Sequence, residues 1–194
     1  MPDPILPMSA PIAASRFERG EVKEPQKTPE MPIPRERIRK FVDQLDFYVA
    51  KYEEAVGASE QCSRFHRVIE ALSQVKATPT WVIMSGLCSS AYQDIGKAYQ
   101  GDIEGWLGSI PDGSSFKKPV QKYKDRLGLV GQAIGTLPSK VSSGDQDVII
   151  GTLSQCSTEM HEESQRIAGE LLGRIRALVQ ELDEELKRKP GQAR

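Results

Sequence analysis

Cysteine and histidine are the residues of this chain whose types and spacing come closest to a catalytic or metal site. Cys62 and His66 are four residues apart, which puts both on one face of a helix, where they could ligate zinc. Cys156 and His161 could supply two more ligands, but five residues on a helix separate two side chains by about 140°. Nothing near either pair orients a base for a nucleophilic cysteine. We therefore interpret the cysteines as small core residues and expect no metal site.

Acidic residues crowd the C-terminal third of the chain. A carboxylate-bridged pair of metals in a helical bundle needs two Glu-x-x-His motifs and two more inward-facing glutamates. Here Thr158, not Glu, stands three residues before His161. We therefore interpret these acidic side chains as a solvated helix face. They are Glu159, Glu162, Glu163, Glu170, Glu181, Asp183, Glu184 and Glu185.

The sequence lacks the motifs of the common enzyme classes. There is no GxGxxG, GxxxxGK[ST], HExxH or GxSxG, and the chain has only 2 histidines. Its 3 cysteines cannot all pair within one chain, and none lies in a CxxC, which is typical of a reducing compartment. We expect no catalytic residues and no cofactor, and a cytoplasmic chain that is not an enzyme.

Two basic clusters stand out against a net charge of −1. Helical spacing puts Lys118, Lys122 and Arg126 in one row, which is either a solvated helix face or an anion-binding surface. Anionic lipid headgroups are the simplest anion, since each cation near a membrane contributes about 1 kcal/mol. Nucleic acid is disfavoured, because the chain is near neutral and no aromatic residues interleave with the cations. The clusters are Lys117, Lys118, Lys122, Lys124 and Arg126, and Arg35, Arg37, Arg39 and Lys40.

Charge and hydropathy exclude several further classes. Lys plus Arg is 26 and Asp plus Glu is 27, so bulk charge does not hold nucleic acid. No uncharged apolar run reaches the ~20 residues that cross a bilayer. The N-terminus has neither a basic region nor an unbroken apolar segment, so we expect no secretory signal. Peripheral attachment is therefore the kind of membrane contact that we consider.

The first 34 residues differ in composition from the rest, because they hold 8 of the 13 prolines. Proline lacks the N–H donor and biases the residue before it toward extended backbone. We predict a disordered arm over 1–34, a helical bundle over 35–188 and a disordered tail over 189–194. The PxxP spacings at Pro4–Pro7 and Pro29–Pro32 arise easily in such an arm. A plain linker is one interpretation, and a ligand for a protein partner is the alternative.

Four amphipathic helices follow the arm. Apolar residues recur at steps of three and four over 35–76, which predicts a helix about 60 Å long at 1.5 Å per residue. Pro, Gly and Ser breaks then separate helices over 80–108, 116–137 and 145–188. The first and last helices match in length, and the two middle ones together span a similar length. We predict an all-α fold, an elongated three- or four-helix antiparallel bundle or coiled coil.

The third helix carries a regular apolar row. Its apolar residues follow one another at steps of four and three, which is the a/d register of a coiled coil. Such a row predicts a seam along which two copies of the chain associate. The predicted dimer seam is Phe116, Val120, Tyr123, Leu127, Val130 and Ile134.

These features are similar to those of BAR-type helical domains, which shape curved membranes, and above all to the C-terminal helical domain of sorting nexins. The stretch from Met160 to Leu186 resembles the last helix of those domains, and Phe116 to Arg126 loosely resembles their central helix. The resemblance implies dimerisation and binding to curved endosomal membrane. Two departures stand against it: the break at 138–144 shortens the arms, and the phosphoinositide-binding domain of sorting nexins has no counterpart in these residues.

The sequence thus leads to a functional hypothesis with one alternative. We expect a non-enzymatic, dimeric helical scaffold that docks on anionic or curved membrane through its basic clusters. The alternative is a soluble protein-interaction adaptor or secreted effector, in which the four helices form a closed bundle and the arm binds a partner.

Overall fold

Helices make up nearly all of the described part of the chain. The computed structural model describes residues 35–75, 78–99, 102–139 and 143–187, and no strand occurs among them. This confirms the predicted all-α helical bundle. The predicted arm and tail lie outside the described residues. The elements are α1 (Arg35–Ser73), α2 (Thr78–Lys97), α3 (Ile103–Ser109), α4 (Lys117–Thr136), the 3-10 turn η1 (Leu137–Ser139) and α5 (Ser143–Lys187).

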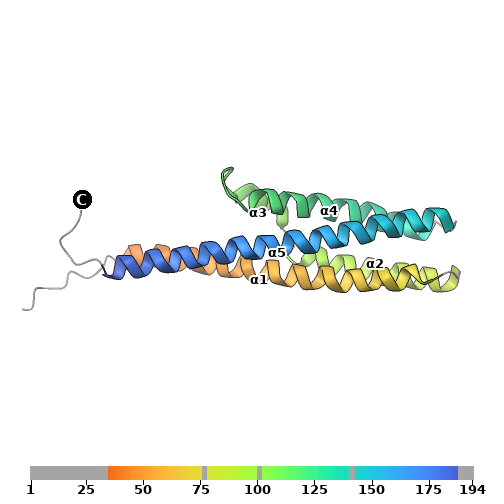
Figure 1. Ribbon diagram of the computed structural model, residues 1–194, viewed down its shortest axis with the longest axis horizontal. Helices are drawn as coiled ribbons and strands as arrows, with labels where there is room; N and C mark the ends of the chain where they lie inside the picture. Colours follow the sequence, from red (N-terminus) through yellow and green to blue (C-terminus); the bar gives the residue numbers. More distant parts are fainter. Residues whose placement is uncertain (1–34, 76–77, 100–101, 140–142, 188–194) are drawn as a thin grey trace, which may run out of the picture. The chain divides into compact units, whose positions relative to one another are not determined.

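The two longest helices, α1 and α5, pack against each other as an antiparallel pair (Figure 1). Their contact is the most extensive between any two elements. Apolar residues at helical spacing are buried along it, such as Ala55 on α1 and Leu171 on α5, each 0% exposed. The buried Ser157 hydroxyl donates to the Cys62 carbonyl at 3.1 Å, so this polar side chain is satisfied inside the interface.

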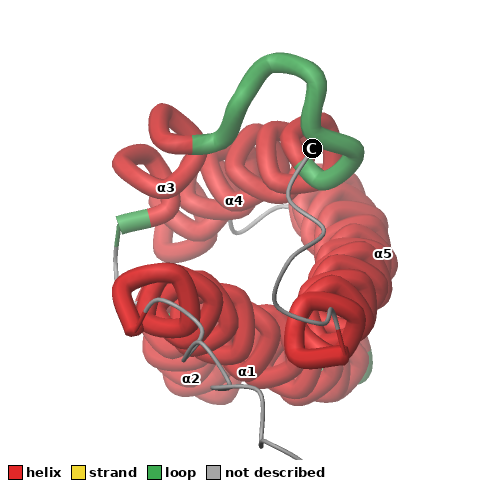
Figure 2. The backbone as a smooth tube through the Cα atoms, turned by 90° about the vertical axis from the view of Figure 1, so that its left-hand side faces the viewer, coloured by secondary structure: helices red, strands yellow, loops and turns green. Residues whose placement is uncertain are grey.

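The other helices cover one side of this pair. α2 packs on α1, α4 packs on α5, and α2 and α4 touch each other, which closes a ring of four helices (Figure 2). α3 packs beside α4. The Tyr48 ring meets the Phe116 ring at 6.5 Å, near the start of α4. Beyond this point the part of α1 before Tyr48 and the C-terminal part of α5 continue as a two-helix projection (Figure 1).

Trp81 anchors α2 to the turn that follows α4. Its side chain is 1% exposed, and its indole N–H donates to the Leu137 carbonyl at 3.1 Å. Leu137 is the C-cap of α4, so its carbonyl has no backbone N–H partner within the helix. The Trp81 side chain provides the partner. The α2 helix contains Gly86 and Gly96, and glycine weakens a helix interior by roughly 0.5–1 kcal/mol. Contacts such as that of Trp81 therefore stabilise α2.

Aromatic rings fill the core between α1, α3 and α4. Tyr99 stacks on Trp106 at 5.3 Å and meets the edge of Tyr123 at 5.1 Å. The Lys51 ammonium lies 5.4 Å from the centre of the Trp106 ring and 2.8 Å from the Glu54 carboxylate. The ammonium thus joins an ion pair and a cation–π contact at the border of the core.

The structure corrects two expectations. The predicted helix over 80–108 is two helices, because α2 ends at Lys97 and α3 begins at Ile103. Asp102 caps the start of α3, where its carboxylate accepts the Gly105 N–H at 2.8 Å. The predicted dimer seam is covered by helices of the same chain, since five of its six residues are buried and Leu127 is half-buried. This row therefore forms the core of one chain and is not available to a second copy.

Candidate functional site

The basic cluster at the start of α4 is engaged with carboxylates of the same chain. Four of its five cations form ion pairs, three of them with α3 or α5. The sequence alone did not indicate these ion pairs, since it left open a solvated helix face or an anion-binding surface. Surface ion pairs of this kind contribute about 0–1 kcal/mol each, so their effect on stability is small. The pairs are Lys117–Asp112, Lys122–Glu163 (3.3 Å), Lys124–Glu104 (2.9 Å) and Arg126–Glu159.

Few of the predicted anion-binding cations remain open. Lys118 is exposed and has no ion pair with any described residue. In the first cluster, Arg37 pairs with Glu185 at 2.7 Å, while Arg39 and Lys40 are exposed on α1. The side chain of Arg35 lies outside the described residues. The structure therefore does not gather the nine predicted cations into one surface.

The cysteines are poor nucleophiles and poor metal ligands in their places. Desolvation by burial raises the pKa of the Cys62 thiol from 9.0 to about 12, and that of Cys88 to about 11. Burial also raises the pKa of Cys156. Each thiol is therefore protonated at neutral pH, whereas the thiolate is the reactive and metal-binding form. No group of three His, Cys, Asp or Glu among the described residues is placed to hold a metal ion.

His161 joins α5 to α1 through a small polar cluster that the sequence did not suggest. Its Nδ1 lies 3.0 Å from the Ser59 carbonyl oxygen, 3.0 Å from the Ser59 hydroxyl and 3.2 Å from that of Ser63. The Gln165 amide nitrogen lies 3.0 Å from Nε2. If the amide donates to Nε2, Nδ1 carries the proton and donates to the carbonyl. That tautomer leaves no base for a serine nucleophile, so the cluster is a contact between helices.

A row of exposed apolar residues runs along one side of the α1/α5 pair. The inner residues of the pair are Phe41, Tyr48 and Ala55 on α1, and Leu171 and Leu178 on α5. An apolar residue follows each of these five inner residues by one position, and Leu186 continues the row of α5 one heptad after Val179. Five of the six members are exposed, and Leu172 is half-buried. We call these six residues the outer face: Val42, Val49, Val56, Leu172, Val179 and Leu186.

Both rows lie on the same side of the pair. In a coiled coil, the position after an inner residue flanks the interface on a fixed side of each helix. Because α1 and α5 are antiparallel and both rows occupy this position, the rows adjoin each other across the pair. α2 and α4 cover the opposite side, where Ala58 and Phe65 of α1 and Ile167 of α5 are 0% exposed. The outer face is therefore left uncovered by the chain's own described helices.

Three of the four exposed large apolar side chains of the projection belong to the outer face, and the fourth is Phe47, which is 45% exposed. On the other side of the projection, where α2 and α4 no longer reach, the corresponding positions are Arg37, Gln44 and Glu181, and all three are exposed. A two-helix projection with one polar and one apolar side is typical of a surface that binds another helical surface. The uncovered side of the α1/α5 pair is therefore a candidate site for such a contact.

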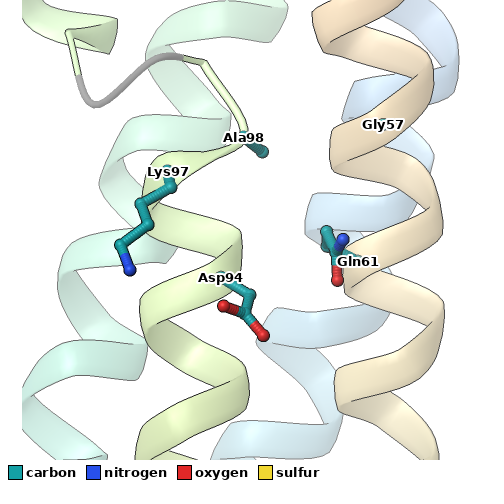
Figure 3. Close-up of a pocket in the computed structure, with 5 residues that line it drawn as sticks. All are labelled: Gly57, Gln61, Asp94, Lys97 and Ala98. Atoms are coloured by element: carbon teal, nitrogen blue, oxygen red, sulfur yellow. The ribbon is translucent and has the colours of Figure 1, made fainter.

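Two hollows on the surface lack such a pattern. A groove of about 290 Å³ lies between α1 and α2, where Gln61 and Asp94 point into it while Lys97 turns away (Figure 3). A second hollow of about 580 Å³ lies beside the start of α4. There the hydrogen bond from Lys117 lowers the pKa of the exposed Asp112 carboxyl. Polar and charged side chains line most of both hollows, and most of these side chains are exposed to solvent.

Comparison with known proteins adds no relative: no family model, curated protein or solved structure matches the chain. Among the described residues, no helix is long and apolar enough to span a membrane. The geometry of the chain itself therefore carries the functional argument.

Proposed function

We propose that this chain is a non-enzymatic helical scaffold that acts by binding another helical surface along its outer face. The observation that carries the proposal is the uncovered apolar side of the α1/α5 pair. Val42 is 44% exposed, Val179 50% and Leu186 53%. The members of the outer face follow one another at intervals of one heptad along each helix. Contiguous apolar surface of this kind marks a contact site more often than isolated exposed residues do. The long helices place this surface on a rigid support.

The groups that could do chemistry support a scaffold over an enzyme. Burial keeps the Cys62 thiol protonated, and the Tyr123 hydroxyl near it, 3.9 Å from the sulfur, also has a raised pKa because of burial. His161 faces two serines, but no carboxylate of the described residues hydrogen-bonds to the imidazole to orient it as a base. These residues are arranged for packing.

Site-specific photo-crosslinking tests the proposal. A photoreactive residue at Val49 is placed on the outer face, and one at Gln44 is placed on the polar side of the same helix. In the cells that make the chain, we expect discrete crosslinked products from position 49 and few from position 44. Equal products from both positions, or none from position 49, would contradict the scaffold function.

Docking on anionic membrane, as the BAR-type resemblance implies, is a second candidate. It is favoured by Lys118 and Lys40, which are exposed and form no ion pair with any described residue. Vesicles containing phosphatidylserine provide the test. If docking occurs, Lys118→Glu with Lys40→Glu lowers the bound fraction several-fold, since each cation contributes about 1 kcal/mol. The variant Arg64→Glu with Lys97→Glu carries the same change of charge elsewhere and is the control. Equal binding by both variants would refute specific docking.

A further inference from the structure

The two apolar rows of the outer face are in register with each other. The ion pair between Arg37 and Glu185, at 2.7 Å, places these residues level on the antiparallel helices. Counting from it, Val42 is level with position 180, next to Val179, and Val49 is level with position 173, next to Leu172. At these two levels the outer face therefore presents one apolar residue from each helix, whereas Val56 is level with Arg166 and Leu186 with Glu36. A surface with this pattern fits another surface that has the same pattern.

Charged residues border the apolar rows in a self-complementary order. Arg39 and Asp46 precede Val42 and Val49 by three residues, and so flank the row of α1 on its far side. Arg176 and Asp183 flank the row of α5 in the same way. By the register above, Arg39 is level with Asp183, and Asp46 with Arg176. All four are exposed, and Asp183 meets only Lys187 of its own helix among the ion pairs of the described residues.

We propose that a second copy of this chain covers the outer face. The copies pack face to face around a two-fold axis parallel to the helices, so that each α1 lies on α5 of the other copy. This arrangement sets Val42 against Val179 of the partner subunit and Arg39 against Asp183 of the partner subunit. It likewise sets Asp46 against Arg176 of the partner subunit. The inference rests on the proposed function, because it names the partner of the same face.

The contact ends where the outer face becomes polar. Glu60 and Glu162 are level with each other and would face their like charge across the two-fold axis. Beside them, the polar cluster of Ser59, Ser63 and His161 replaces the apolar rows. The two copies therefore touch along residues 38–56 of α1 and the matching part of α5, and separate beyond them.

The size of this contact suits a reversible dimer. Nineteen residues at 1.5 Å each give a length of about 28 Å, and two helices side by side are about 20 Å wide. The two copies together then bury about 1,100 Å², just above the roughly 1,000 Å² that a specific interface needs. We expect a dissociation constant in the micromolar range, about 1–100 µM.

Sedimentation equilibrium of the full chain, from about 1 to 300 µM, tests the proposal. The mass rises from that of one chain toward that of two. Val49→Lys with Val179→Lys places charges in the contact and weakens the dimer at least about 100-fold. Gln44→Lys with Gln180→Lys adds the same two charges at exposed positions outside the outer face and changes the dissociation constant less than about threefold. Circular dichroism confirms that both variants keep the helical content.

Charge reversal tests the pairing itself. Arg39→Glu sets a glutamate against Asp183 of the partner subunit at two symmetric places in the dimer. We expect this substitution to raise the dissociation constant of the dimer about tenfold. Adding Asp183→Arg to the same chain restores the wild-type dissociation constant to within about threefold. A single-chain mass at 300 µM would overturn the proposal, and so would equal effects of the two lysine variants or failure of the reversal to restore the dimer.

The failures of the two proposals are distinguishable. If the chain is a monomer in sedimentation but position 49 yields crosslinks to other proteins, the scaffold function stands and the second copy is wrong. If position 49 yields no crosslinked product in cells, the scaffold function itself is wrong.

Discussion

Replacing Trp81 with phenylalanine tests how this chain stabilises its glycine-containing α2. The indole N–H donates to the Leu137 carbonyl at 3.1 Å, and this carbonyl lies at the C-terminal end of α4. Phenylalanine keeps one ring but has no donor. The carbonyl then loses the partner that a helix end requires.

The expected loss of stability follows from two contributions. An unsatisfied buried carbonyl costs about 1–3 kcal/mol. The space left by the smaller ring costs about 1 kcal/mol more, because Trp81 is 1% exposed and its surroundings relax only in part. We therefore expect Trp81→Phe to lower the free energy of unfolding by about 2–4 kcal/mol.

Urea unfolding followed by circular dichroism at low protein concentration measures this loss. Val82→Ala is the matched control, because Val82 is the next residue of α2 and is 57% exposed. We expect it to change the free energy of unfolding by less than about 0.5 kcal/mol. The reasoning is refuted if Trp81→Phe costs no more than Val82→Ala, with equal denaturant slopes for both.

Three further predictions concern the core. Lys51→Met leaves the Glu54 carboxylate, whose side chain is 9% exposed, without its ion pair, and lowers the free energy of unfolding by about 2–3 kcal/mol. The control Lys187→Met removes an exposed ion pair and lowers it by less than about 0.5 kcal/mol. Burial raises the pKa of Cys62 from 9.0 to about 12, so stability is full below about pH 9 and falls as pH rises toward 12. Between pH 8 and 10 this thiol lowers the free energy of unfolding of the wild-type chain by about 1.4 kcal/mol. In urea unfolding at these two pH values, the free energy of unfolding of Cys62→Ala falls by about that much less. Val130→Ala, in the buried row of α4, lowers stability by about 2 kcal/mol and leaves the dimer dissociation constant unchanged in sedimentation. A small cost at Lys51, an equal pH response in Cys62→Ala or a weakened dimer in Val130→Ala would each contradict its prediction.

The sequence predicted the helices well because apolar spacing is a local signal. The spacing of the row from Phe116 to Ile134 predicts an apolar seam, and five of its six residues are buried. The predicted partner of this row, a second copy of the chain, was wrong. Spacing shows that a row is covered, but not whether helices of the same chain or of another chain cover it. The covering residues on α2 and α5 are far away in the sequence.

The basic cluster shows the same limit for charges. Lys122 meets Glu163, 41 residues later, and Arg126 meets Glu159. No local pattern reveals such pairs, so the sequence does not show that these cations have carboxylate partners in the same chain. The polar cluster around His161 was likewise invisible, since its serines come from α1.

The outer face had a signal that was open to a closer reading of the sequence. Val49 and Val56 belong to the same apolar stripe as Leu45 and Tyr52 when that stripe is read as one row. Separating it into an inner row and a row one position later shows that α1 has apolar residues for two contacts. Within one chain, α5 packs only on the inner row of α1. The second row of α1 is therefore left for a partner.

Methyl spectra of a valine-labelled chain, recorded across a dilution series, test most directly where this molecule makes its contact. We predict that the methyl signals of Val42, Val49 and Val179 shift with protein concentration, while those of Val120 and Val130 stay in place. Shifts confined to Val120 and Val130 would return the contact to the α4 row, and the absence of any shift up to 300 µM would contradict self-association through the outer face.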